Sequence, residues 1–102
     1  METFEEAVYK IATEIADLVI SKQRDYGHGN ILAFGELGVL VRCSDKIERL
    51  KNLWKRGIEP ENETVTDTWK DLVGYSFIAL MLREGTFTLP LKEDAEKQKE
   101  KR

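Results

Sequence analysis

Apolar residues recur every three or four positions along most of the chain, which is the spacing of one face of a helix. The spacing predicts a first helix over residues 3–22, a second over residues 31–56 and a third over residues 64–83. Seven glycines and two prolines among 102 residues are too few turn formers for a many-stranded barrel. We therefore expect an all-α fold in which three main helices form a bundle.

The segments around the second helix carry the residues that begin, bend and end helices. Residues 22–30 contain two glycines and many polar side chains, so we expect a loop whose last residue, Asn30, caps the second helix. Gly57 is placed to end that helix. Gly35 and Gly38 fall inside it, and their cost in a helix interior predicts close helix packing or a bend.

The third helix is apolar around most of its circumference after Asp71, which is more than a small monomer needs to cover one face. This pattern predicts a homo-oligomer, either a dimer or a tetramer, that completes the bundle. Residues 86–91 alternate larger apolar with smaller side chains and predict an extended C-terminal arm, with exchange between copies left open. We expect one domain over residues 1–91 and a charged tail over residues 92–102, either frayed or a solvated helix.

Composition narrows the class of protein. An apolar fraction of 41% is too high for a disordered chain, and a net charge of -3 argues against the broad basic surface that sequence-independent nucleic-acid binding needs. The single cysteine, Cys43, has no partner for an internal disulfide. Neither a signal peptide nor an apolar run of membrane-spanning length is visible, so we expect a cytoplasmic protein without membrane contact.

Acidic residues form the strongest pattern with chemical meaning. Asp45 and Glu48 are three apart in the second helix, and Asp67 and Asp71 are four apart in the third, so each pair projects from one helical face. Two such faces meeting in a bundle predict an oxygen-rich site for Mg²⁺, with Mn²⁺ as the alternative. The competing interpretation is structural, because the same residues suit intrahelical ion pairs and helix capping.

Cationic and polar residues predict a site for a phosphorylated ligand beside these carboxylates. Lys46 and Arg49 follow helical spacing in the second helix, and Lys22 lies at the start of the expected loop, so the three could neutralise phosphate charge. Tyr26 could stack on a base, and Asn30 could bind a base edge or a sugar hydroxyl. A solvated, salt-bridged helix face is the alternative interpretation for the cations.

Three blocks of residues, in this order, resemble the nucleotide modification associated domain family of the first type, which occurs largely in phages and bacteria. The resemblance covers about residues 15–82 and implies nucleotide-related biology, in the host cytoplasm if the chain is phage-encoded. The blocks are Lys22-x-x-Asp25-Tyr26-Gly27-x-x-Asn30, Asp45-Lys46-Ile47-Glu48-Arg49-Leu50-x-Asn52-Leu53 and Asp67-Thr68-x-x-Asp71-Leu72-x-Gly74-Tyr75.

A more distant resemblance is to the MazG-like all-alpha nucleotide pyrophosphohydrolases, which hold Mg²⁺ with an E-x-x-E pair on one helix and an E-x-x-D pair on the next. Asp45-x-x-Glu48 would be the first pair, and Asp67-x-x-x-Asp71, one residue wider, the second. The resemblance implies hydrolysis of a nucleoside triphosphate to the monophosphate and pyrophosphate, with these four carboxylates as catalytic metal ligands. A nucleotide-binding module without catalysis and a structural interaction protein remain the alternatives.

Overall fold

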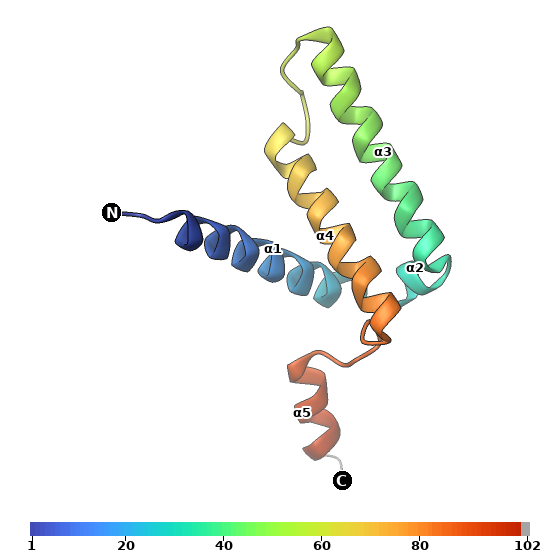
Figure 1. The fold of residues 1–102 in the computed structure, drawn as a ribbon. Helices are drawn as coiled ribbons and strands as arrows, with labels where there is room; N and C mark the ends of the chain where they lie inside the picture. Colours follow the sequence, from blue (N-terminus) through green and yellow to red (C-terminus); the bar gives the residue numbers. More distant parts are fainter. Residues whose placement is uncertain (101–102) are drawn as a thin grey trace.

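The computed structural model describes residues 1–100 and consists of helices and their connections, which confirms the all-α class. In chain order the helices are α1 (Phe4–Tyr26), α2 (Gly29–Leu32), α3 (Gly35–Arg56), α4 (Val65–Glu84) and α5 (Lys92–Glu100). The helices α3 and α4 form an antiparallel pair, and the C-terminal half of α1 crosses α4 (Figure 1). This arrangement is compatible with a bundle in which α4 is central, because α4 contacts both α1 and α3.

The ends of the long helices follow local signals in the sequence. The hydroxyls of Thr3 and Thr64 each accept a hydrogen bond from the backbone N–H three residues later, at 3.2 and 3.0 Å, and so cap α1 and α4. Gly57 and Gly85 follow α3 and α4 with φ angles of 62° and 74°, in the left-handed region that favours glycine. The predicted ends of the second and third helices are confirmed within two residues.

The start of the second predicted helix differs from the sequence prediction in two ways. The helix α1 continues to Tyr26, through residues that the sequence assigns to a loop, because the first residue with positive φ is Gly27, at 70°. Asn30 does not cap a helix, since it lies inside the short helix α2. The extension of α1 places Lys22 and Tyr26, four residues apart, on one helical face.

Glycine also divides the predicted second helix. Gly35 has a φ of 61° and lies where α2 and α3 meet, so the chain turns there instead of continuing as one helix. Gly38 lies inside α3, and a Cβ atom at that position would come within 2.7 Å of Phe34 Cβ. The close approach at Gly38 is thus to the residue that precedes α3 and not to a neighbouring helix, and the predicted bend lies at Gly35.

The buried core is small and lies where α2, α3 and α4 meet the segment after α4. Ile31, Val39 and Phe87 are buried together, and Cys43 packs against them. Ile15 is buried separately on α1. No helix within the described residues is long and apolar enough to cross a membrane.

The C-terminal segment is turned, where the sequence predicts an extended arm. Residues 86–91 form no strand; the Leu89 N–H donates to the Thr86 carbonyl at 3.2 Å, and Phe87 inserts into the core. The helix α5 stands apart from the rest of the chain and is tied to α1 by an ion pair between Arg24 and Glu93 (Figure 1). Residues 92–100 of the predicted tail are thus helical, and residues 101–102 lie outside the described part.

Candidate functional site

A pocket of about 340 Å³ lies where the C-terminal half of α1 meets α2, α3 and α4. Its volume falls in the range of about 300–1,000 Å³ that is usual for small-molecule sites. Three groups line it: apolar side chains, two aromatic rings, and a polar set of cations, amides and one carboxylate. The lining residues are Leu18, Val19, Lys22, Gln23, Tyr26, Asn30, Ile31, Arg42, Asp71, Gly74, Tyr75 and Ile78.

The pocket brings together side chains that the sequence separates by about 50 residues. Lys22 and Tyr26 reach it from the last two turns of α1, which runs about one turn beyond the predicted helix end at residue 22, and Asn30 reaches it from α2. Asp71 enters from α4. Four residues that the sequence singles out for ligand binding therefore line one pocket.

Asp71 is the most constrained of these side chains. Its two carboxylate oxygens lie 2.9 Å from Lys22 Nζ and 3.0 Å from Lys46 Nζ, and the side chain is 11% exposed. Burial by itself would raise the pKa of Asp71, but the hydrogen bonds from the two lysines outweigh it and hold the pKa below its ordinary value. Asp71 is therefore an ionised group that joins α1 to α3 through α4.

Behind Asp71, Glu63 organises a second group of polar contacts. Lys46 Nζ lies 2.8 Å from a Glu63 carboxylate oxygen, Arg49 donates to the Glu63 carbonyl, and the buried Thr68 hydroxyl donates to the carboxylate at 2.6 Å. Burial would lower the pKa of Lys46, but its hydrogen bonds to Glu63 and Asp71 raise it above the ordinary value. Lys46 is thus a charged bridge between the two carboxylates.

Sequence reasoning missed Glu63 as a site residue, whereas Arg42 belongs to the cationic helix face that it predicted beside the carboxylates. Glu63 directly precedes Thr64, the cap of α4, and carboxylates are favoured at a helix N-terminus, so its position carried a usable signal. Arg42 precedes Lys46 and Arg49 by four and seven positions, so it shares their helical spacing in α3. Its place in the pocket follows from helix packing.

Lys46 and Arg49, which the sequence assigns to phosphate binding, do not line the pocket. Both are held by Glu63, and Lys46 also by Asp71. Of the two cations that line the pocket, Lys22 is paired with Asp71, and Arg42 forms no ion pair among the described residues.

Two buried polar atoms near the pocket have no hydrogen-bond partner among the described atoms. One is the Oδ1 atom of Asn30, which lies in the lining, and the other is Nη1 of Arg49. A buried polar atom without a partner destabilises the protein unless a ligand or water satisfies it. The amide oxygen of Asn30 is therefore a ready acceptor for a ligand N–H or O–H group.

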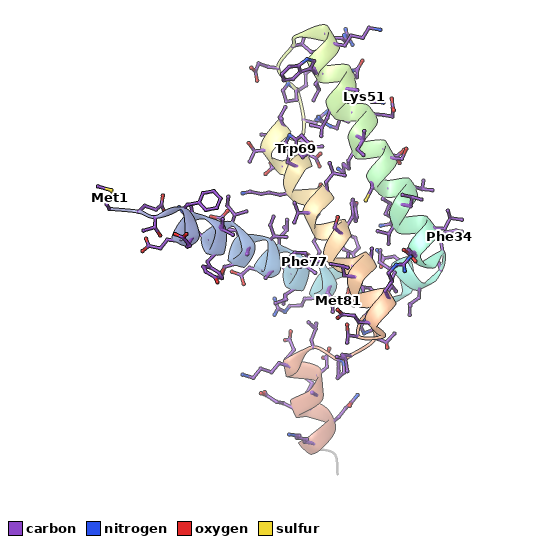
Figure 2. All side chains as sticks on the ribbon, viewed as in Figure 1. Met1, Phe34, Lys51, Trp69, Phe77 and Met81 are labelled. Carbon is purple, nitrogen blue, oxygen red and sulfur yellow. The ribbon has the colours of Figure 1, made fainter. Side chains whose placement is uncertain are left out.

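The four carboxylates assigned to a metal do not meet in this arrangement. Asp45, Glu48 and Asp67 are exposed, and Glu48 pairs with Lys51 toward the far end of α3 at 3.4 Å (Figure 2). Within residues 1–100, no three His, Cys, Asp or Glu side chains are grouped so as to hold a metal ion. Of these four carboxylates, only Asp71 lines the pocket. A metal site that uses all four of them stays a prediction.

Comparison of the chain with protein-family models, with curated proteins and with solved structures finds no match. The resemblance to nucleotide-related families therefore remains a prediction from the three blocks of residues that carry it.

Proposed function

We propose that the protein binds a nucleoside polyphosphate in the pocket between α1 and α4. The observation that carries the proposal is that Lys22, Tyr26 and Asn30 line one pocket and that the Asn30 amide oxygen there is buried without a partner. Lys22 and Arg42 would contact phosphate oxygens. Tyr26 would stack on the base, because an aromatic ring at a partly apolar pocket offers a flat surface for it.

The charge balance supports an anionic ligand. Asp71 is already neutralised by Lys22 and Lys46, so an incoming phosphate does not meet an uncompensated carboxylate. Arg42 lines the pocket and has no ion pair among the described residues. Charge-assisted hydrogen bonds from lysine and arginine to phosphate are among the stronger polar contacts that proteins make.

Thermal unfolding against a panel of nucleoside mono-, di- and triphosphates, with and without Mg²⁺, tests the proposal. A ligand at 100 times its Kd stabilises the folded state by about 2.7 kcal/mol, which raises the Tm of a domain of this size by several degrees. We expect triphosphates to raise the Tm and Lys22→Ala to weaken binding about tenfold or more. Lys10→Ala is the matched control, since Lys10 lies about 18 Å from Lys22 along the same helix.

Two results would contradict nucleotide binding in this pocket. One is the absence of any Tm shift across the panel, which would favour a structural interaction protein. The other is equal binding by the Lys22→Ala and Lys10→Ala variants, which would place the ligand elsewhere on the molecule.

Mg²⁺-dependent pyrophosphohydrolysis is a second candidate function, favoured by the position of Asp71 in the same pocket. Mg²⁺ is often held by only one or two carboxylates together with substrate phosphates and water, so a metal arriving with the polyphosphate needs few protein ligands. Asp71 would be that ligand, and the ion would polarise the α-phosphoryl group. The other three carboxylates are too exposed here to assign a step to them.

Released pyrophosphate separates hydrolysis from binding alone. If the protein is a hydrolase, pyrophosphate accumulates with Mg²⁺, and Asp71→Asn abolishes its release while Asp17→Asn, on the solvent side of α1, does not. Bound triphosphate that survives long incubation with Mg²⁺ or Mn²⁺ would instead favour the binding module without catalysis.

A further inference from the structure

One face of α1 carries a stripe of apolar residues, and other helices cover only part of it. The stripe consists of Phe4, Val8, Ile11, Ile15 and Leu18. Ile15, in the middle of the stripe, is 1% exposed, whereas Phe4, Val8 and Ile11 on the same face are 79%, 48% and 58% exposed. Figures 1 and 2 show the reason, because the N-terminal half of α1 runs beyond α4 and ends at Met1 with no other helix beside it. We call residues 4–12 the overhang.

The surface area of the chain indicates that a partner is missing. A folded monomer of 11.8 kDa exposes roughly 5,900 Å², whereas this chain exposes 8240 Å². Its radius of gyration is 16.4 Å, against about 13 Å for a compact chain of this length. The helix α5 contributes to this excess, and so do exposed apolar residues on α1, α3 and α4, those of the overhang among them. Obligate dimers bury about 2,000–5,000 Å² in total, which is the size of the excess taken over two chains.

A groove that could receive a helix lies between α3 and α4. It has a volume of about 430 Å³ and is lined mainly by apolar residues of both helices, of which Leu37 and Leu40 are 69% and 63% exposed. The ion-paired Glu36 and Arg83 also line it. Its α4 lining includes Ser76 and Ala79, which lie about 140–200° around the helix from Gly74, where α4 faces α1. The groove is therefore free of the chain's own α1.

Both surfaces are mainly apolar. The overhang holds Glu5, Glu6 and Lys10, and the charged residues of the groove lining are Glu36 and Arg83, which pair with each other at 2.8 Å. Since both surfaces belong to the same chain, the partner that fits each of them is another copy.

We propose that a second copy of this chain covers the overhang, and that the overhang of each copy packs into the α3–α4 groove of the other. The arrangement is reciprocal, so one two-fold axis generates two identical contacts. This reciprocal packing buries the exposed half of the α1 stripe and fills the groove. It does not involve the pocket between α1 and α4.

Sedimentation equilibrium of the full chain and three variants tests the proposal. Val8→Asp alters the overhang, Leu40→Asp alters the groove, and Thr13→Asp places the same charge on the opposite face of α1. We expect the wild type and Thr13→Asp to sediment at twice 11.8 kDa. Val8→Asp and Leu40→Asp should each raise the dimer dissociation constant about 100-fold, because a carboxylate would enter an apolar contact.

Mixing the two disrupted variants tests reciprocity itself. In a mixed pair, the intact overhang of Leu40→Asp meets the intact groove of Val8→Asp, so one of the two contacts survives. The equimolar mixture should therefore recover a two-chain species that neither variant forms alone.

Three results would overturn the proposal. They are a wild type that stays at 11.8 kDa at every concentration, a Val8→Asp variant that associates as tightly as Thr13→Asp, and a mixture that stays monomeric. If an aspartate variant fails to fold, Val8→Ser and Leu40→Ser repeat the comparison with a milder change.

Discussion

Asp71 joins three helices through one side chain, since its carboxylate on α4 accepts hydrogen bonds from Lys22 on α1 and pairs with Lys46 on α3. Such a contact is stronger than an exposed ion pair, because the carboxylate is largely buried and has a charged partner on each oxygen. Removing the Asp71 carboxylate would leave the ammonium groups of Lys22 and Lys46 near each other with less negative charge to balance them. The stability of the site should therefore depend on the charge of Asp71.

The lowered pKa of Asp71 predicts a specific pH dependence. Its stabilising contribution is present above the ordinary aspartate pKa of about 4 and is lost as the pH falls below that value. At neutral pH, Asp71→Asn should lower the free energy of unfolding by about 1.5–3 kcal/mol. This difference from the wild type should shrink as the pH falls below about 4, because the protonated carboxyl resembles the amide.

Urea unfolding of both proteins between pH 7 and pH 2.5 measures this difference. Asp17→Asn, an exposed position on α1, is the matched control and should change stability little at any pH. A difference between wild type and Asp71→Asn that stays constant down to pH 2.5 would show that the carboxylate charge is not its cause.

The helices begin and end where short-range chemistry allows. Threonine hydroxyls cap α1 and α4, and glycines with positive φ end α1, α3 and α4. The same chemistry explains the boundaries that apolar spacing places wrongly, because α1 runs on until Gly27 and Gly35 turns the chain between α2 and α3. Helix boundaries in this protein thus depend more on glycine geometry than on the pattern of apolar residues.

Two glycines provide a matched test of this conclusion. Gly57→Ala should lower the free energy of unfolding by about 1–2 kcal/mol, because its φ of 62° is strained for a residue with a Cβ atom. Gly29→Ala, inside α2 without a positive φ and with open space around its Cα, should leave stability unchanged or raise it by up to about 1 kcal/mol. Urea unfolding of both variants measures the two effects, and equal losses would contradict the role given to φ.

The whole chain has too few buried apolar residues to account for its apolar content. Ile15, Ile31, Val39 and Phe87 are the buried apolar side chains among those described, whereas large apolar residues on every long helix are exposed. The buried area of a small domain is already marginal for stability. We therefore expect folding of this chain to be coupled to association with its second copy.

Coupled folding and association make the Tm depend on protein concentration. The Tm of the wild type should rise with chain concentration, and that of Val8→Asp should not. Calorimetry over a hundredfold range of concentration measures this effect, and a wild-type Tm that is independent of concentration would contradict the coupling.

The sequence alone was sufficient to predict the helical class, the approximate extent of the three long helices and the end of the second predicted helix at Gly57. It also singled out Lys22, Tyr26 and Asn30, although it placed them in a loop. These features depend on residues within a few positions of one another, through helical periodicity, capping and glycine geometry. Such information is present in any short window of the chain.

Only the tertiary structure decided which of these residues meet. The pairing of Asp71 with Lys22, the exposure of Asp45 and Glu48, and the coverage of just half of the α1 stripe all depend on how helices cross. Spacing along the chain defines which residues share a face of one helix but not which face packs against another. Which helix faces pack together depends on side-chain shape and burial summed over the whole molecule. The residues that form the pocket could therefore be identified only from the packed helices.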